Sequence, residues 1–446
     1  MAQPPGSRLP ALAQAALMSV DPYRWLTSRW RRYGDVFTAR FPLFGEITYV
    51  ADPDGVREVF GGDPETHRAG EANAGPLGPI LGTGSLLTLD GSEHLRHRRL
   101  LLPSFHGERV RTYAGMVAEI AEAEIAHWPL GRPFPLRPAM QRITLEVILR
   151  AVFGVRGEER LERFRTELPR IGEVSNAVLF FTALRRDLGP WSPWARFKRM
   201  RDAVDELVYE EIALHRSAPD LDERDDVLSL MLSARDEDGQ PMTDSELRDE
   251  LLTLLTAGHE TTATGLSWAF ERLVRTPPAM AAAVDSLDGD DAYLDAVAKE
   301  TLRLRPVIVD VARKLTADWQ LHGYDLPADT LVIPAITVMH RRPDLWDRPL
   351  QFRPERFLEG QPAPYSWIPF GGGVRRCIGA SFAQMEMRVV LRAVLERLEL
   401  RSVREEDERP RVRHVTAVPG RGAEVVALAR AGAARGRAST AAGATA

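Results

Sequence analysis

Residues 366–379 read Ser-Trp-Ile-Pro-Phe-Gly-Gly-Gly-Val-Arg-Arg-Cys-Ile-Gly, and they include Cys377, the only cysteine among 446 residues. One cysteine can neither form a disulfide within the chain nor supply a zinc or iron–sulfur site that needs several thiolates. Three glycines follow Phe370, and glycine allows a loop to turn tightly and to approach a flat ligand closely. Arg375 and Arg376 place positive charge beside the sulfur, which favours the thiolate over the thiol.

The residues after Gly379 have a helical pattern, so the sequence places Cys377 at the N-terminus of a helix, where free N–H groups and the helix dipole stabilise an anion. A lone buried cysteine can also be an ordinary small hydrophobic residue. A single thiolate in a glycine-rich loop beside an aromatic ring, however, has the properties that an axial ligand of haem iron requires. The stretch therefore predicts a haem–thiolate site at Cys377.

The same stretch resembles the haem-binding signature of the cytochrome P450 family, position for position. The matching residues are Phe370, Gly373, Arg375, Cys377 and Gly379. The resemblance implies a mainly α-helical P450 fold, with a large helical part around haem b and a smaller β-rich part. It gives Cys377 the role of iron ligand. It also implies haem contacts from Phe370, Gly371, Arg375, Gly379, His94, Arg98, Ala257 and Arg313.

A short basic helix opens at Ser92 and carries His94 and Arg98 four residues apart, so that both lie on one face. From spacing alone, this segment is equally well a solvated basic helix. In the family the matching positions bind a haem propionate, and the resemblance gives the same role to Arg313. We therefore expect these three residues beside the haem edge.

Glu300 and Arg303 lie three residues apart on a predicted helix over 290–305 and can pair across one turn. A lone Glu-x-x-Arg motif is common by chance. The resemblance implies that this pair and Arg356, on a proline-fixed loop, form a buried network that supports the cysteine loop. Their expected role is structural and not catalytic.

The capping box Thr243-Asp-Ser-Glu246 starts a periodic stretch that runs to Thr276. A helix over 243–276 would be roughly 50 Å long, and its apolar middle predicts burial. Glycine and polar residues are costly in such a helix, yet the block Ala257–Thr262 contains both. A packing glycine with a back-bonded threonine is one explanation. In the family, a similar block lies on the long helix that crosses above the haem.

Glu260 and Thr261 are an adjacent acid and alcohol that could relay protons through ordered water. A thiolate ligand favours O–O cleavage over reversible oxygen binding. Together these residues favour monooxygenation, in which one oxygen atom enters an apolar substrate, the other leaves as water, and two electrons come from a partner. A haem–thiolate protein that only senses gas or transfers electrons is the alternative, and it would not need this pair. A cysteine hydrolase is disfavoured because no catalytic histidine sits in a motif that can be placed.

The candidate pocket walls are mostly apolar, which suits a terpenoid, polyketide or fatty-acid-like substrate of bacterial secondary metabolism. Residues 61–91 are rich in glycine and proline, and we expect them to form a long loop that acts as a lid. Asp310 interrupts an apolar run and either binds a polar group of the substrate or faces solvent. The candidate pocket residues are Leu86, Leu87, Val178, Phe181, Leu254, Ala257, Ile308, Val309 and Val418.

Asp21-Pro22 and Asp52-Pro53 each predict an N-cap followed by proline at the first helical position. Between them, Val36–Phe41 and Glu46–Val50 predict a β-hairpin. No repeat or linker divides the chain, which predicts one domain over residues 1–430. The low-complexity residues 431–446 predict a disordered tail.

The net charge of −5 at pH 7 is small for this length and disfavours nucleic acid as a partner. The N-terminus lacks an apolar run of about 18 residues, so we expect neither a membrane anchor nor a secretory signal. The scarcity of cysteine fits a reducing compartment. We therefore expect a cytoplasmic, monomeric enzyme.

No Gly-x-Gly-x-x-Gly fingerprint follows a predicted strand, so electrons must come from separate proteins. Arg96, Arg99 and Arg376 flank the segments that hold the haem, and we expect them to be surface charges. A local positive patch on an acidic protein steers an acidic partner. We expect a small ferredoxin, or a flavodoxin, that is reduced by a separate NAD(P)H-dependent reductase.

Overall fold

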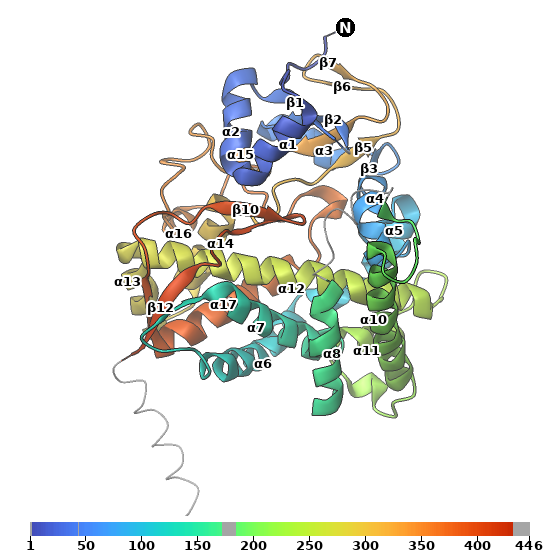
Figure 1. The fold of residues 1–446 in the computed structure, drawn as a ribbon, viewed down its shortest axis with the longest axis vertical. Helices are drawn as coiled ribbons and strands as arrows, with labels where there is room; N and C mark the ends of the chain where they lie inside the picture. The colour runs from blue at the N-terminus through green and yellow to red at the C-terminus, as the bar shows by residue number, and fades with distance from the viewer. Residues whose placement is uncertain (1, 43, 172–183, 431–446) are drawn as a thin grey trace, which may run out of the picture.

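The computed structural model describes residues 2–42, 44–171 and 184–430, and it places a large helical part below a smaller part that contains most of the β-structure (Figure 1). The helix α12 (Asp244–Arg275) has 32 residues and crosses the helical part from one side to the other. The predicted capping box starts it, because Thr243 accepts the Glu246 N–H and the Glu246 carboxylate accepts the Thr243 N–H. The prediction of one long, largely buried helix is confirmed.

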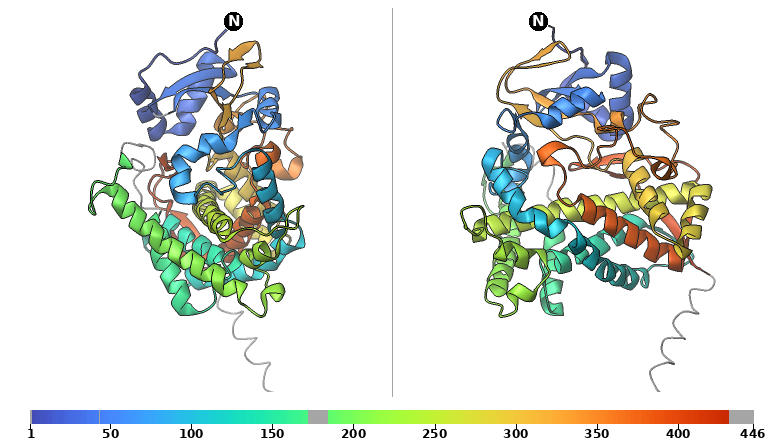
Figure 2. Two further views of the ribbon diagram at one scale, coloured as in Figure 1. Left: turned by 90° about the vertical axis from the view of Figure 1, so that its right-hand side faces the viewer. Right: turned by 180° about the vertical axis from the view of Figure 1, so that it is seen from behind.

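Four helices pack around the long helix α12 or against one another to form the larger hydrophobic core. Seen from behind, α17 runs alongside α12 (Figure 2). The close contact is at Gly265, where a Cβ atom would lie 3.3 Å from the Met387 sulfur. The four helices are α6 (Glu108–Ile125), α7 (Leu136–Ala151), α14 (Ala292–Leu304) and α17 (Ala380–Arg397).

The smaller part is built on a five-stranded sheet in the order β1-β2-β8-β5-β3. The expected hairpin is confirmed, since Val36 on β1 pairs with Val50 on β2 in antiparallel register. β2 then pairs with β8 in parallel. The strands are β1 (Val36–Phe41), β2 (Gly45–Val50), β3 (His67–Arg68), β5 (Arg313–Leu315) and β8 (Leu331–Pro334).

Both predicted N-caps are present. The Asp21 side chain accepts the Arg24 N–H at the start of α2 (Pro22–Tyr33), and the Asp52 side chain accepts the Gly55 N–H at the start of α3 (Pro53–Gly61). Proline occupies the first helical position in each case, where its missing N–H costs no hydrogen bond.

The prediction that residues 61–91 form a loop throughout is wrong, because Ala69–Leu81 is the helix α4. Its first free N–H groups are capped from a distance: Gly70 N and Glu71 N donate to the Asp90 carboxylate at 2.8 and 2.7 Å. The segment after α4 is fixed to α12, since Gly84 N donates to Asp249 at 2.8 Å. Hydrogen bonds therefore fix this segment to the rest of the fold, whereas a lid that opens freely would lack them.

Further elements complete the described chain, and a turn at Gly323 joins β6 to β7. The further helices are α1 (Ala11–Val20), α5 (Gly91–Leu101), α8 (Glu158–Ile171), α10 (Pro193–Arg216), α11 (Val227–Ser233), α13 (Pro277–Asp285), α15 (Ile336–Met339) and α16 (Arg356–Glu359). The further strands are β4 (Pro133–Pro135), β6 (Trp319–Leu321), β7 (Tyr324–Leu326), β9 (Leu398–Ser402), β10 (Pro410–Arg413), β11 (Thr416–Pro419) and β12 (Glu424–Ala429). No helix in the described part of the chain is both long and apolar enough to span a membrane.

Candidate functional site

The loop that carries Cys377 is fixed by its own backbone and by α3. The Cys377 N–H donates to the Phe370 carbonyl at 2.9 Å, and the Phe370 ring meets the edge of Trp367 with centroids 6.0 Å apart. Gly373 has a positive φ of 63°, and a Cβ atom there would lie 2.0 Å from the Phe60 carbonyl oxygen. Only glycine fits this position, because a side chain would be strained and would collide with α3.

The Cys377 side chain has accessible surface, although burial is the main influence on its pKa and raises it. An accessible group that is also deeply surrounded by protein faces an internal space. The Gly379 N–H and the charges of Arg98 and Arg376 favour the thiolate and oppose the effect of burial. Arg375, which the sequence placed beside the sulfur, is directed elsewhere.

The long helix α12 is exposed in its middle, at Thr256 and Ala257. The turns on either side of these residues are buried, from Leu251 to Leu255 and from Thr262 to Leu273. Exposure in the middle of a buried helix again indicates an internal space. The helix α17 that follows the cysteine loop packs against α12, and both the loop and this stretch of α12 have accessible side chains.

Four basic side chains from three segments meet beside this loop. They are His94 and Arg98 on α5, Arg313 on β5 and Arg375 on the cysteine loop. Burial and, to a smaller extent, the charges of Arg375, Arg98 and Arg313 together lower the pKa of His94 to about 3. His94 is therefore neutral and available as a hydrogen-bond donor.

Few acids compensate this basic cluster. Arg375 pairs with Asp90 at 2.5 Å, whereas the buried Arg313 donates to the Ala312 carbonyl at 3.0 Å. Within the described residues, Arg98 and Arg313 form no ion pair. Buried charge without an acid is costly, so the cluster fits an anionic ligand group such as a haem propionate. The thiol and the cationic cluster together fit haem b.

Glu260 and Thr261 are adjacent in sequence but have different partners. The Glu260 carboxylate pairs with Arg137 and accepts the Gln141 side-chain amide at 2.7 Å, both from α7. The Thr261 hydroxyl donates to the Ala257 carbonyl at 2.5 Å, which is the back-bonded threonine that the sequence left as an alternative. The structure does not join the two side chains, and their role as a proton relay stays a prediction.

Glu300, Arg303 and Arg356 form one buried network. Arg303 donates two hydrogen bonds to Glu300 at 2.7 and 2.8 Å, and Arg356 donates to the same carboxylate at 3.1 Å. Arg303 also donates to the His340 carbonyl at 2.6 Å. His340 in turn accepts the Ile368 N–H at 2.8 Å. The network therefore reaches the start of the cysteine loop through His340.

The candidate pocket residues lie in different surroundings. Leu86 and Leu254 are buried in the larger core, and Leu87 packs against it. Ile308 is half-buried and forms a bridge with Thr416 of β11. Val418 is buried on β11, and Val309 is buried in an apolar cluster with Tyr49 and Ile333. The pocket roles of these residues stay predictions. Val178 and Phe181 lie outside the described residues.

Asp310 does not face solvent in the way that one reading of the sequence suggested. Its carboxylate accepts the buried Tyr49 hydroxyl at 3.3 Å, and its other oxygen is buried without a hydrogen bond. Burial raises the pKa of Asp310 to about 7. The residue is therefore a partly satisfied interior acid.

The expectation that Arg96 is a free surface charge is wrong. Arg96 pairs with Asp236 at 2.6 Å and with Glu246 at 2.7 Å. Arg99 is exposed and pairs with the exposed Glu237 at 2.5 Å. Arg376 is exposed and, within the described residues, has no ion-pair partner.

Sequence reasoning missed four residues that hold the site together, namely Arg137, Gln141, Asp90 and His340. Each contacts a site residue that is distant in the chain; Arg137, for example, is 123 positions from Glu260. No local spacing signals such a pairing.

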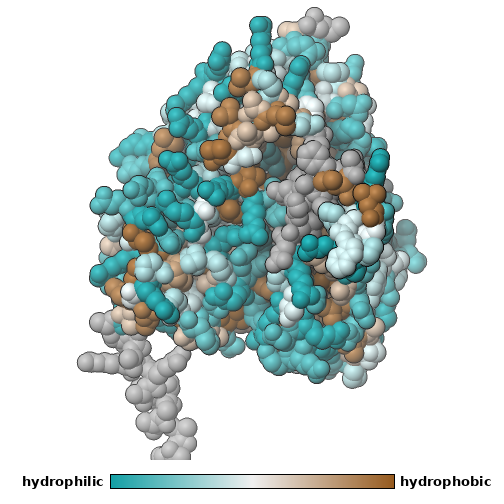
Figure 3. Space-filling model, viewed as in Figure 1, coloured by the Kyte–Doolittle hydropathy of each residue, from teal (hydrophilic) through white to brown (hydrophobic). Residues whose placement is uncertain are grey.

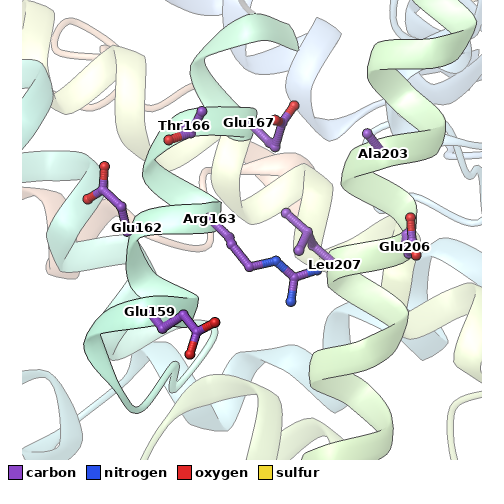
Figure 4. Close-up of a pocket in the computed structure, with 8 residues that line it drawn as sticks. All are labelled: Glu159, Glu162, Arg163, Thr166, Glu167, Ala203, Glu206 and Leu207. Atoms are coloured by element: carbon purple, nitrogen blue, oxygen red, sulfur yellow. The ribbon is translucent and has the colours of Figure 1, made fainter.

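A separate hollow of about 550 Å³ lies between α8 and α10 (Figure 4). Glutamates dominate its lining, and Arg163 projects between them. None of its lining residues belongs to the site around Cys377. Its residues are Glu159, Glu162, Arg163, Thr166, Glu167, Ala203, Glu206 and Leu207.

Comparison with known proteins gives a consistent result. The family described as "Cytochrome P450" matches residues 4–423. A Mycobacterium tuberculosis protein described as cytochrome P450 135B1 is 46% identical over 445 residues, which cover 95% of this chain and 91% of the relative. Another from the same species, described as cytochrome P450 138, is 40% identical and covers 95% and 96% of the two chains.

Solved structures agree in fold. Cyanobacterial CYP120A1 with bound retinoic acid has a TM-score of 0.81 at 25% identity and covers 96% of this chain and 99% of its own. The haem domain of cytochrome P450DA has a TM-score of 0.85 at 24% identity, over 97% and 98% of the two chains.

Proposed function

Because the chain belongs to the cytochrome P450 family, whose members bind haem b and are generally monooxygenases, we propose that it inserts one oxygen atom from O2 into an apolar small molecule. The observation that carries the proposal is the pairing of one accessible thiol, at Cys377, with a buried cluster of cations. Terpenoid, polyketide and fatty-acid-like skeletons are the substrate classes that suit the apolar candidate walls. The product is a hydroxylated or otherwise oxidised form of the substrate.

Cys377 would bind the haem iron, and Arg98, Arg313, Arg375 and neutral His94 would hold the propionates. Bound haem supplies the activation of O2. On the α12 side, the Thr261 hydroxyl would hold a proton near the Ala257 carbonyl, and the Glu260 carboxylate would resupply protons once it leaves Arg137. Accessible Ala257 leaves room for a substrate against the helix.

Electrons would come from an acidic ferredoxin, or a flavodoxin, with a separate NAD(P)H-dependent reductase. A haem–thiolate sensor or electron carrier is the second candidate. The exposure of Thr256 and Ala257 in the middle of α12 favours the enzyme, because a protein that only transfers electrons needs no substrate space there.

The thiolate is tested by the absorption spectrum of the reduced, CO-bound protein. The wild type should show the strongly red-shifted Soret band of a thiolate complex. Cys377→Ser should lose that band, whereas Ser381→Ala, on the exposed first turn of α17, should keep it. An unchanged band in Cys377→Ser would refute the assignment.

The reaction class is tested by substrate binding and turnover. Apolar natural products should displace the resting Soret band, and products with one added oxygen atom should form with O2 and surrogate redox partners. If ligands bind but no oxidised product forms with any electron donor, the result supports the alternative function as a sensor.

A further inference from the structure

Helix α1 (Ala11–Val20) exposes three of its large aliphatic side chains, Leu12, Leu17 and Val20. Leu12 is 74% exposed, Leu17 47% and Val20 68%, and Leu9, just before the helix, is 42% exposed. The sequence of α1 contains no charged residue. Surface helices usually bury their aliphatic residues and expose polar ones, whereas α1 exposes most of its large aliphatic side chains. In Figure 3, hydrophobic residues gather where Figure 1 labels α1.

The inward side of α1 combines the partly buried Ala15 and Met18, which pack against the apolar cluster around Tyr23 and Phe37, with one fully buried polar residue. Gln14 is fully buried, and its side-chain amide donates to the Leu9 carbonyl at 2.8 Å and to the Ser7 carbonyl at 3.4 Å. Its carbonyl accepts the Arg40 N–H of β1 at 3.4 Å. These bonds set the rotation of the helix about its axis. The outward leucines are therefore a fixed feature of the fold.

Unpaired arginines surround this apolar stripe. Arg8 precedes α1, Arg24 lies on α2, and Arg411 and Arg413 lie on β10, and both α2 and β10 pack against α1. All four are exposed and, within the described residues, none has an ion-pair partner. The whole chain carries a net charge of −5, so this positive charge is local.

We propose that the face formed by α1 and its surrounding arginines docks on the surface of an anionic lipid bilayer. An uncharged helix with outward aliphatic side chains and a rim of arginines has the features of an interfacial helix, which lies in the plane of the membrane. A bilayer accepts separate aliphatic side chains without a matching groove, and its anionic headgroups pair with arginines. The helix would lie on the bilayer surface and would not cross it. Docking would bring the protein to the lipid in which apolar molecules dissolve.

The test uses the full-length holoenzyme and sedimentation with vesicles of phosphatidylcholine, with or without phosphatidylglycerol. The wild type should bind the vesicles that contain phosphatidylglycerol, and binding should weaken as salt is added. The double variant Leu12→Gln, Val20→Gln should bind these vesicles at least about tenfold more weakly than the wild type. The double variant Arg411→Gln, Arg413→Gln should lose much of the preference for the anionic lipid.

The matched control is Leu130→Gln with Leu358→Gln, which removes two leucines that are 54% and 50% exposed on other elements. It should bind as the wild type does. A wild type that remains in the supernatant overturns the proposal, as does equal binding by the α1 variant. If the α1 variant instead converts a dimer to a monomer in light scattering and no form binds vesicles, the face holds a second copy and the proposal fails. The measurement involves no turnover, so its failure leaves the proposed function untouched.

Discussion

Thr261 is the residue at which the proposed proton delivery can be tested most directly. Thr261→Ala removes the hydroxyl that donates to the Ala257 carbonyl but should keep haem and substrate binding. Electrons should then be diverted to peroxide or water, because the distal proton donor is lost. We expect the product formed per NAD(P)H consumed to fall by about tenfold, measured with redox partners present.

The control for this change is Thr261→Ser, which keeps a hydroxyl at the same position and should retain most of the coupling. Thr262→Ala alters the neighbouring buried threonine and should leave the ratio near that of wild type. A Thr261→Ala protein that couples as well as wild type would count against the proton-relay role.

Individual residues were predictable where their chemistry is local. Cys377 could be singled out because it is the only thiol and stands in a glycine-rich, basic stretch. The partner of Glu260 could not be predicted, because Arg137 lies on another helix. A carboxylate is fixed by whichever cation the fold brings to it, and that choice has no signature in the residues beside Glu260.

The same distinction holds for whole elements. The start of α12 was predictable because its capping box lies within four consecutive residues, Thr243–Glu246. The helix α4 was not, because Pro76 and Pro79 lie inside it and its N-terminus is capped by Asp90 from a later segment. Tertiary contacts can override weak local propensity, and the sequence of α4 shows none of them.

A buried histidine joins α10 to α11 and should make stability depend on pH. Burial opposes the charge of His215, but the carboxylates of Asp226 and Glu211, which lie 3.5 and 3.2 Å from its ring nitrogens, outweigh it and raise the pKa of His215 to about 9. A raised pKa in the folded state contributes stability that is fully present below the unfolded value of about 6.5 and is lost as pH rises through about 9. Since one pKa unit corresponds to about 1.4 kcal/mol, the contribution is about 3 kcal/mol.

The free energy of unfolding should therefore fall by about 3 kcal/mol between pH 6.5 and pH 9.5 because of this one group. Urea unfolding across that range measures it. His215→Gln should flatten this part of the profile, whereas His127→Gln, an exposed histidine on another segment, should not. Parallel profiles for His215→Gln and wild type would show that the histidine is not charged in the folded protein.

At the scale of the whole molecule, charge is distributed differently from the sequence expectation. The expected basic patch loses Arg96, because Asp236 and Glu246 neutralise it. Arg99 keeps an exposed ion pair, and pairs of that kind contribute little in water. Arg376 remains an exposed cation on the cysteine loop, beside Val374, which is 44% exposed. An acidic electron donor would therefore be steered chiefly by the loop itself.

Arg376→Glu should slow the first electron transfer from an acidic ferredoxin several-fold at low salt, because reversing this charge repels the partner during encounter. Exposed charges are screened over about 8 Å at physiological ionic strength, so wild type and variant should converge as salt is added. Stopped-flow reduction under CO measures the rate.

Reduction by dithionite should be unchanged, which separates partner docking from damage to the haem site. The control variant Arg411→Glu reverses an exposed charge on β10, and ferredoxin should reduce it at the same rate as the wild type. If neither salt nor Arg376→Glu changes the rate of the first electron transfer, this loop is excluded as the docking site.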